Sequence, residues 1–442
     1  MKNITIKKIK QFLNRFNKNK TNKLLKNVNT KVKFENLVLK SNYMQDKKRS
    51  FKKYIDVDTT ITNQENSGRC WMFAALNVLR LDMIKKHKLD NFEFSENYLI
   101  FFDKLEKTKF FIDFIVKNKT TNINDLKLLN ILTRGQTDGG RWSLFKSLIE
   151  KYGIIPKSNM SDHFHSKNTK EFNDFYNNYL IKIAYKIRNH KGDINELVDE
   201  ILYNSYRILI IFLGEPPQTI NWEYYKNVNK KKVYKSINNI TPLNFYKKFV
   251  SHNVTNKVCL INYPCQTVPF YKLYNVELSF SVDDKFDEYI NIPIEKMVEL
   301  VKKSIDNNTA VWCGIDTNKY ISREEGFLDE KGFNYLNVFD ENITLDDKCD
   351  SLEYRQSAPN HAIIIRGYNF DGKTNGFLVE NSWGEKKGYK GNYYMSLDWF
   401  KKYTYKIVID KKFLSNKEIN VLKQKPVLLP YYSPFGNLLN NN

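Results

Sequence analysis

The sequence contains few cysteines. Five occur in 442 residues: Cys70, Cys259, Cys265, Cys313 and Cys349. Domains held by a disulfide framework have many cysteines for their length, and zinc sites repeat them at short spacing. Neither pattern is present, so we expect no disulfide framework and no metal site. A reducing compartment fits these cysteines best.

Long apolar runs are also absent. A membrane-spanning helix needs roughly 18–20 consecutive apolar residues, whereas the stretch Ile-Leu-Ile-Ile-Phe-Leu at 208–213 is short enough for a buried strand or helix turn. The first residues lack the apolar segment of a secretory signal, and a mitochondrial presequence would favour Arg and Ser over Lys and Asn. They predict a basic helix with Ile9, Phe12, Leu13 and Phe16 on one face, which we expect to pack on the fold. The expected location is the cytoplasm, with no membrane contact.

Acidic residues are the minority among the charged ones. Lys and Arg number 71 against 49 Asp and Glu, a formal net charge of +22. Such an excess can attract nucleic acid, anionic membranes or acidic substrates. The charge is scattered, however, and even the densest run, Lys230-Lys231-Lys232, is typical of a solvated loop. Weak, non-specific nucleic-acid binding therefore stays open as a secondary property.

The distribution of apolar residues predicts an α+β fold. Hydrophobic residues make up 41% of the chain, which excludes a wholly disordered protein. Residues 71–88 form a helix that is apolar on nearly every side, as expected in the middle of a large protein. Charged helical segments follow from about 165 to 310, and beyond 355 apolar runs alternate with turns such as Asp371-Gly372. The outline is a helix-rich N-terminal half and a C-terminal antiparallel sheet, with a helical insertion between them.

Cys70 stands one residue before the buried helix. The unpaired N–H groups and the dipole of a helix N-terminus favour a thiolate, which is the reactive form of cysteine. This position therefore suits a nucleophile. By itself the signal is weak, because a lone cysteine is more often a small hydrophobic core residue.

Three further side chains fit the same chemistry. His361 opens an apolar strand, so its imidazole can share the thiol proton, although it can also be a core histidine. Asn381 follows the next apolar run and can accept a hydrogen bond that fixes the imidazole tautomer, with Trp383 shielding that bond from water; an ordinary turn is the alternative. Gln64, six residues before Cys70, can join the Cys70 N–H in stabilising an oxyanion.

These residues lie in segments that resemble a known family. The run Gln64-Glu65-Asn66-Ser67-Gly68-Arg69-Cys70-Trp71 is similar to the active-site segment of the papain superfamily, Gln-x5-Cys-Trp. The sequence from Ser67 through Arg80 resembles the corresponding segment of the bleomycin hydrolase and aminopeptidase C branch. Secreted papain-like enzymes carry a disulfide-forming cysteine where Ser67 stands, so its absence agrees with an intracellular enzyme. Other similar segments lie at 138–142, 151–158, 222–225, 311–314, 360–362 and 379–384, so the resemblance covers nearly the whole chain.

The resemblance implies a papain-like cysteine peptidase core with a large helical insertion and a C-terminal arm. After a basic helical lead-in at 1–50, the helical half with the nucleophile spans 51–164, the insertion 165–310, the β half with His and Asn 311–425, and the arm 426–442. The implied site residues are the catalytic Cys70, His361 and Asn381, the oxyanion-hole Gln64, and the substrate-binding Asp138, Gly139, Gly140 and Trp383. No metal or organic cofactor is needed. The implied assembly is a homohexameric barrel whose active sites face the interior.

The arm determines the expected specificity. In the family its end lies in the cleft, and its terminal carboxylate receives the free amino group of the peptide, which makes the enzyme an aminopeptidase. The arm is recognisable here at 428–439, including Gly436, Leu438 and Leu439, but this chain runs on through 440–442. The tail is then trimmed, bends aside or inhibits the site. The alternatives are a papain-like endopeptidase or acyltransferase, and a basic nucleic-acid-binding homo-oligomer with a silenced peptidase site.

Overall fold

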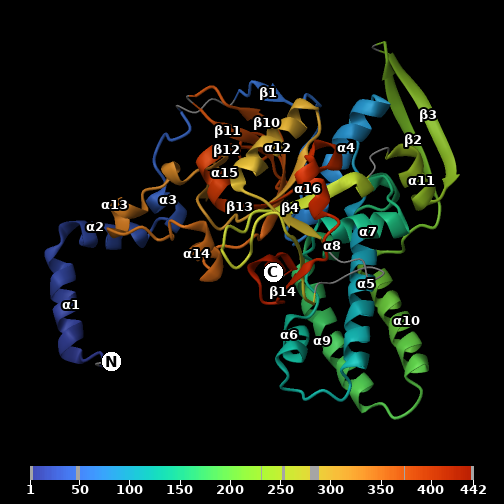
Figure 1. Cartoon of the computed structure of the whole chain (residues 1–442), viewed down its shortest axis with the longest axis horizontal. Helices are drawn as coiled ribbons and strands as arrows, with labels where there is room; N and C mark the ends of the chain where they lie inside the picture. The colour runs from blue at the N-terminus through green and yellow to red at the C-terminus, as the bar shows by residue number, and fades with distance from the viewer. Residues whose placement is uncertain are drawn as a thin grey trace.

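The computed structural model describes residues 3–45, 50–229, 231–250, 254–278, 288–372 and 374–439. The chain forms a helical half and a β half, with a lead-in of short helices at one side (Figure 1). Among the described residues, no helix combines the length and apolar character needed to cross a membrane.

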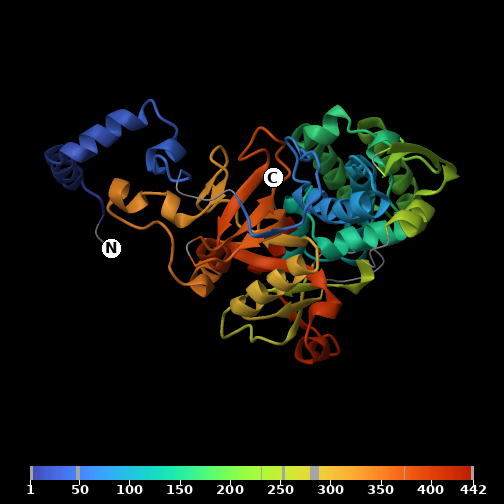
Figure 2. The same cartoon turned by 90° about the horizontal axis from the view of Figure 1, so that it is seen from above.

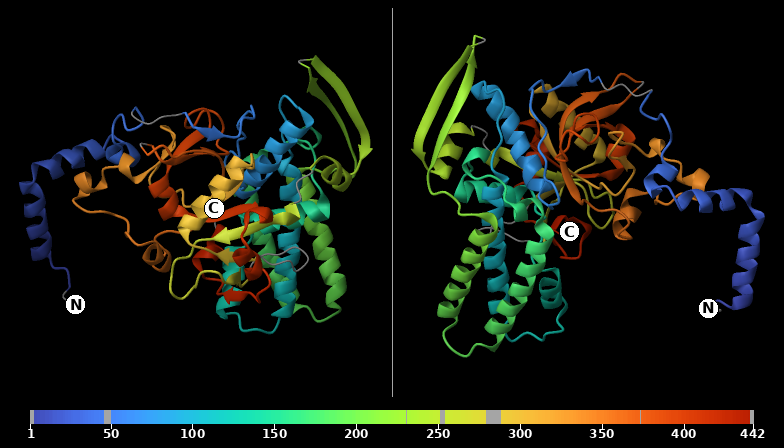
Figure 3. Two further views of the ribbon diagram at one scale, coloured as in Figure 1. Left: turned by 45° about the horizontal axis from the view of Figure 1, so that its top comes forward. Right: turned by 180° about the vertical axis from the view of Figure 1, so that it is seen from behind.

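The lead-in stands away from the rest of the molecule. It consists of α1 (Ile6–Lys18), α2 (Lys20–Asn29) and α3 (Phe34–Val38). The Thr5 hydroxyl caps α1 by accepting a hydrogen bond from the Lys8 N–H. Figure 3 shows α1 projecting from the body in both views, and Ile9, Phe12 and Leu13 are more than half exposed. The expectation that this helix packs on the fold is therefore wrong, because no described part of the chain covers its apolar face.

The helical half surrounds one buried helix. Its elements are α4 (Cys70–His87), α5 (Glu96–Lys117), α6 (Leu126–Arg134), α7 (Trp142–Tyr152), α8 (Phe164–Lys167), α9 (Thr169–Asn189) and α10 (Ile194–Leu213). As predicted, α4 is buried on nearly every side, because α5 and α7 cover it on one side and the sheet on the other. The long helices α5, α9 and α10 lie side by side (Figure 1).

The expected helical insertion at 165–310 is not helical throughout, because strands interrupt it after α10. A long hairpin follows, β2 (Ile220–Val228) with β3 (Lys231–Ile240), and then α11 (Pro242–Phe249). Trp222 anchors the base of the hairpin, because its ring stacks on Tyr224 and packs edge-on against Phe245 and Phe249. The next strands of the insertion belong to the main sheet, so its last third is part of the β half.

The β half is built on one 12-stranded sheet. Its strand order is β14-β5-β6-β4-β13-β7-β10-β11-β12-β9-β8, and β1 pairs with β10. The strands are β1 (Lys53–Tyr54), β4 (Lys257–Ile261), β5 (Leu273–Val276), β6 (Tyr289–Asn291), β7 (Val311–Ile315), β8 (Ile321–Ser322), β9 (Phe327–Leu328), β10 (His361–Asn369), β11 (Gly376–Glu380), β12 (Asn392–Ser396), β13 (Thr404–Asp410) and β14 (Val427–Leu429). The central strands from β4 to β12 are antiparallel, which agrees with the predicted α+β class.

The middle of the sheet lies between helices. The β half also contains α12 (Ile294–Asp306), α13 (Tyr335–Phe339), α14 (Lys348–Glu353), α15 (Leu397–Tyr403) and α16 (Asn416–Val421). Figure 2 shows the orange and red strands next to the blue and green helices of the other half. Because both α4 and α12 contact β10, its run Ile363–Ile365 is buried on both faces. Burial on both faces explains why this part of β10 is a continuous apolar run, because an antiparallel strand with one exposed face would alternate apolar and polar residues.

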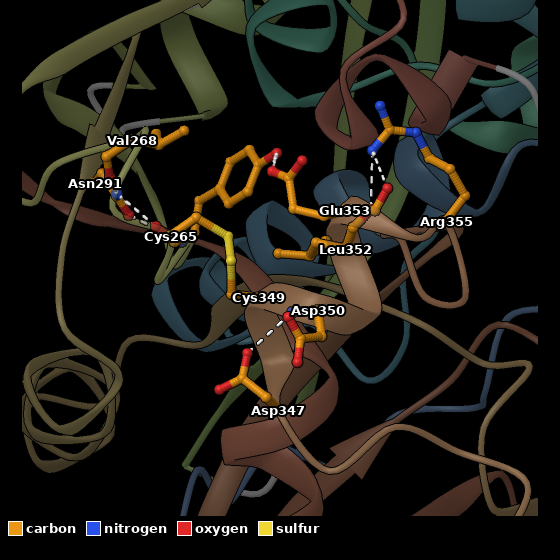
Figure 4. The surroundings of a disulfide bond; sticks show 10 residues. Cys265, Val268, Asn291, Asp347, Cys349, Asp350, Leu352, Glu353 and Arg355 are labelled. Carbon is orange, nitrogen blue, oxygen red and sulfur yellow. Dashed lines mark hydrogen bonds between the residues drawn. A yellow bond between two sulfur atoms is a disulfide. The ribbon is translucent and has the colours of Figure 1, made fainter.

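A disulfide joins Cys265, in the loop after β4, to Cys349 in α14 (Figure 4). The two residues are 84 positions apart in the sequence. The expectation that the cysteines are all reduced is therefore wrong for this pair, because only the folded sheet brings them together. Among the described residues Cys70, Cys259 and Cys313 are free thiols.

Candidate active site

Cys70 is the first residue of α4, so the helix begins one position earlier than the sequence predicted. Its side chain is buried, and the backbone N–H groups of Ala362, Trp71 and Cys70 itself lie close enough to favour its thiolate. Burial raises the pKa of the Cys70 thiol to about 11, and these N–H groups oppose that rise. The sulfur therefore lies between the first turn of α4 and the first residues of β10.

His361 is the first residue of β10, and its Nε2 lies 2.9 Å from Oδ1 of Asn381. The N–H of Ser382 donates to the same Oδ1, at 2.8 Å, which identifies this atom as an acceptor. The hydrogen-bond network therefore assigns the imidazole proton to Nε2 and leaves Nδ1 unprotonated. Burial lowers the pKa of His361 to about 4; the bond to Asn381 opposes this fall, and the positive charge of Arg323 adds to it.

Trp383 covers the bond between His361 and Asn381. Its ring centroid is 4.9 Å from that of His361, and the edge of Tyr393 supports it at 5.9 Å. On another side, the guanidinium carbon of Arg323 lies 4.5 Å from the Trp383 ring centroid. The indole therefore lies beside the imidazole, and its shielding of the imidazole–amide bond from water stays a prediction.

Gln64 is tied to the loop that carries Asn381. The Gln64 N–H donates to the Ser382 carbonyl at 2.9 Å, and the Ser382 hydroxyl donates to Oε1 of Gln64 at 2.8 Å. Its Nε2 donates to the Ser67 carbonyl, in the loop that leads to Cys70, at 2.6 Å. Because its oxygen is held by Ser382, the amide NH2 group is turned toward the loop that leads to Cys70. No pattern in the sequence singles out Ser382.

Asp138 connects the nucleophile loop to the helical half. Its Oδ2 accepts from the Gly68 N–H at 3.0 Å, its Oδ1 lies 3.0 Å from Nζ of Lys104, and its carbonyl accepts from the Trp71 indole at 2.7 Å. Burial alone would raise the pKa of Asp138, but the Lys104 charge and the Thr169 and Gly68 hydrogen bonds outweigh it and hold the pKa well below its usual range. Asp138 is thus an anchor of the loop before Cys70.

Gly139 and Gly140 have packing roles in the structure. The Gly139 carbonyl accepts a hydrogen bond from Nζ of Lys107 at 2.7 Å. A Cβ on Gly140 would lie only 2.3 Å from Cε2 of Trp71, so this position requires glycine for the close approach of the indole. Neither glycine is among the described residues that line the cleft, and their contact with substrate stays a prediction.

The site residues open onto a cleft of about 680 Å³ between the two halves. Arg134 at the end of α6 and Asn173 in α9 belong to the helical wall, whereas His361, Trp383 and Arg323 belong to the β wall. Cys70, Gln64 and Asp138 also line it. The structure thus brings together Cys70, His361, Asn381, Gln64 and Trp383, which the sequence placed in segments up to 319 residues apart.

The arm is seated on the β half as far as the structure describes its side chains. Strand β14 pairs in parallel with β5, and Phe435 stacks on Tyr263 with ring centroids 5.1 Å apart. The Lys406 ammonium donates to the Phe435 carbonyl at 3.4 Å. Gly436, Leu438 and Leu439 continue in a 3-10 helix (Pro434–Leu439). The side chains of Leu438 and Leu439, and all of residues 440–442, lie outside the described part, so the expected entry of the arm into the cleft stays a prediction.

Comparison with known proteins agrees with this geometry. A model of the peptidase C1-like family matches residues 3–436. The human (Homo sapiens) bleomycin hydrolase is 36% identical over 393 residues, 86% of each chain, and the aminopeptidase C of Lactobacillus delbrueckii subsp. lactis is 35% identical over 396 residues, 87% of each. The crystal structure of PepW from Lactobacillus rhamnosis HN001 superposes with a TM-score of 0.92 at 32% identity, covering 98% of this chain and 99% of that one. The chain therefore belongs to the peptidase C1-like family of papain-like cysteine peptidases, in the branch of bleomycin hydrolase and aminopeptidase C.

Proposed function

We propose that this cysteine peptidase releases N-terminal residues from peptides through a triad of Cys70, His361 and Asn381. One observation carries the proposal. Cys70 and His361 line the same cleft, the Ala362 N–H directly after His361 favours the Cys70 thiolate, and Nε2 of the imidazole is held by Asn381. A nucleophile, a base and an orienting amide in this order are the arrangement that acyl transfer requires.

The reaction begins with a proton transfer inside the site. Burial disfavours an isolated thiolate and an isolated imidazolium, as the pKa values of about 11 for Cys70 and about 4 for His361 indicate. Transfer of the thiol proton to Nδ1 creates both charges side by side, so each stabilises the other. The helix N-terminus adds stabilisation of the thiolate.

The thiolate then attacks the first peptide carbonyl. The Cys70 N–H and the Gln64 amide donate to the resulting oxyanion. His361 gives its proton to the leaving amine, the carbon–nitrogen bond breaks, and a thioester with Cys70 remains. Water attacks the thioester, His361 accepts the water proton, and the thiol is restored with release of the N-terminal residue.

The arm supplies the requirement for a free N-terminus in this proposal. The contacts of β14 and Phe435 with the β half support an arm that is fixed at its base. In this proposal the residues after Gly436, including Leu438 and Leu439, enter the cleft, where a terminal carboxylate receives the substrate's amino group. Whether residues 440–442 are trimmed, bend aside or block the site determines how strong this requirement is.

Assembly and location complete the proposal. The uncovered apolar face of α1, with Ile9, Phe12 and Leu13 exposed, supports self-association, and we propose the homohexamer that the family resemblance implies. The proposed compartment is the cytoplasm. Size-exclusion chromatography with light scattering measures the oligomer, and a monomer at micromolar concentration would contradict it.

The decisive experiment uses pairs of fluorogenic amides that are either free or acetylated at the amino end. The chain is compared with Cys70→Ala and with Cys259→Ala, a matched control that removes a free thiol outside the cleft. Cleavage of the free substrates alone, lost only in Cys70→Ala, supports an aminopeptidase with a working arm. Equal cleavage of both substrates supports the endopeptidase alternative. No cleavage of either contradicts the enzymatic proposal.

A secondary, non-specific affinity for nucleic acid is favoured by the hairpin β2–β3. It exposes Lys231 and Lys235 together with the aromatic rings of Tyr225 and Tyr234. Lysines neutralise phosphates and exposed rings stack on bases, so single-stranded nucleic acid is the expected ligand. Affinity for an oligonucleotide that falls steeply with salt, and falls further in Lys231→Gln/Lys235→Gln, supports this property. Affinity independent of salt contradicts it.

A further inference from the structure

Arg323 lies on the β wall of the cleft, in the turn between β8 and β9. Its guanidinium carbon is 4.5 Å from the Trp383 ring centroid, and that ring is 4.9 Å from the His361 ring. Arg323 lines the same cleft as Cys70. A positive charge therefore stands one aromatic ring beyond the proposed catalytic imidazole.

The backbone of Arg323 is held in place. Its carbonyl accepts hydrogen bonds from the Gly388 N–H at 2.8 Å and from the Tyr393 hydroxyl at 3.3 Å. The side chain itself is exposed to solvent over the indole. A guanidinium that lies over an aromatic face keeps the N–H groups at its edge for a planar acceptor such as a carboxylate.

Neighbouring carboxylates leave this charge uncompensated. Within the described residues no salt bridge joins Arg323 to an acidic group, and the adjacent Glu324 is ion-paired with Lys387. On the helical wall, Asp138 pairs with Lys104 and Asp174 pairs with Lys170. The charge also acts on the proposed base. Burial is the main cause of the lowered pKa of His361, and the positive charge of Arg323 lowers that pKa further.

The proposed mechanism determines which part of the substrate meets Arg323. The acyl part is bonded to Cys70 and its oxygen points to Gln64, whereas the leaving amine takes its proton from His361. The leaving group therefore lies over the imidazole, and the chain beyond it continues across Trp383. The first or second residue after the scissile bond thus comes within reach of the guanidinium.

We propose that Arg323 is a specificity-determining residue that binds a carboxylate in the leaving part of the peptide. The inference rests on the proposed function. The carboxylate comes either from an Asp or Glu side chain after the scissile bond or from the free C-terminus of a dipeptide. Both offer the planar, bidentate acceptor that a guanidinium binds best.

The test compares substrates that differ only in this charge. Peptides share the N-terminal residue that an aminoacyl-coumarin screen shows to be cleaved best. One pair ends in Glu-amide or Gln-amide, and a second pair in Ala or Ala-amide, so that the two sources of carboxylate are separated. Release of the first residue is measured by mass spectrometry for the unchanged chain and for Arg323→Gln and Arg323→Lys. The control variant is Lys386→Gln, which removes an exposed positive charge near Trp383 in the sequence that does not line the cleft.

We expect kcat/KM of the chain to favour the carboxylate member of at least one pair by about three- to ten-fold at low salt, and the preference to shrink in 0.5 M salt. Arg323→Gln should abolish the preference and Arg323→Lys should retain part of it. Lys386→Gln should keep the preference and change cleavage of the coumarin substrate by less than about two-fold. Equal rates within both pairs, or a preference that survives Arg323→Gln, would overturn this inference alone. Failure to cleave any substrate, coumarin included, would overturn the proposed function as well.

Discussion

At the scale of single residues, the site depends on hydrogen bonds that fix otherwise mobile groups. Asn381 is the clearest case, because its Oδ1 accepts from both the His361 imidazole and the Ser382 N–H. That second bond fixes the orientation of the amide, and the amide in turn fixes the imidazole tautomer. The proton of the imidazole is then on the side away from Cys70, which is the arrangement that a base requires.

Asn381→Ala should therefore lower kcat of the aminopeptidase by about 10- to 100-fold and leave KM nearly unchanged, because the imidazole loses its fixed tautomer and orientation. The measurement is steady-state kinetics on the best coumarin substrate. The control is Asn360→Ala, whose side-chain amide lines the cleft but bonds Thr317 and Asp316 instead of the His361 imidazole. A kcat within two-fold of the unchanged chain would argue against the orienting role.

The pH dependence follows from the same two buried groups. The reactive site carries one proton, shared by Cys70 and His361. With a pKa of about 4 for His361 and about 11 for Cys70, this state predominates from pH 5 through neutrality. We expect kcat/KM to fall below about pH 4, where a second proton binds at His361. Since the positive charge of Arg323 lowers the pKa of His361, Arg323→Gln should move the acid limb to higher pH. If the acid limb of kcat/KM lies at the same pH in Arg323→Gln and in the unchanged chain, the charge of Arg323 does not affect the pKa of His361.

At the scale of elements, the start of α4 is positioned by a buried ion pair. Asp138 accepts a hydrogen bond from the Gly68 N–H and forms an ion pair with Lys104. The side chains of Asp138 and Lys104 are both almost fully buried. Removing one partner of such a pair leaves an uncompensated charge in the interior. The turn before Cys70 therefore depends on a side chain from the loop between α6 and α7, for which the resemblance had suggested a substrate contact.

Asp138→Asn should destabilise the fold by about 3–5 kcal/mol, because Lys104 then loses its buried counter-charge. The matched control is Asp174→Asn, which breaks an ion pair on the surface. Asp174 is 63% exposed and its partner Lys170 is 87% exposed, so this change should lower the free energy of unfolding by no more than about 0.5 kcal/mol. Because the folded pKa of Asp138 is depressed, its contribution is present above the unfolded pKa near 4 and is lost as pH falls below it. Urea unfolding at pH 7 measures the cost of each variant, and the same experiment at about pH 2.5, well below the unfolded pKa, measures the loss with pH. Equal losses in the two variants would contradict this assignment.

At the scale of the whole molecule, the disulfide joins two elements that form the seat of the arm. Cys265 and Cys349 lie in the cluster of buried residues that also contains Tyr263, Leu352 and Phe435. Figure 4 shows the bond between the loop after β4 and α14, with Glu353 and Arg355 at the end of that helix. Arg355 donates to the Tyr432 carbonyl at 3.1 Å, so the bridged helix also contacts the arm directly.

Reduction of this disulfide should lower the thermal stability of the chain. Closing a loop of 84 residues restricts the unfolded chain by about 4 kcal/mol in the chain-entropy description. We expect a lower Tm after addition of a reductant, and a similar loss without it in Cys265→Ser/Cys349→Ser. The double variant should no longer respond to reductant. A response that persists in the double variant would assign the effect to another thiol.

The family and the α+β class could be read from the sequence, which also predicted the reactive groups of the proposed site. These follow from local signals: a cysteine at the start of an all-apolar helix, a histidine that opens an apolar strand, and an amide in the next turn. Short-range patterns of this kind are readable because helix and strand periodicity involve neighbouring residues.

Only the tertiary structure decided which groups meet. It paired Cys265 with Cys349, placed β4, β5 and β6 in the main sheet, left the apolar face of α1 uncovered and set Arg323 over Trp383. Each of these depends on contacts between segments far apart in the sequence. Such contacts form only when the sheet order is fixed, and neither residue of such a pair carries a local signal for its partner.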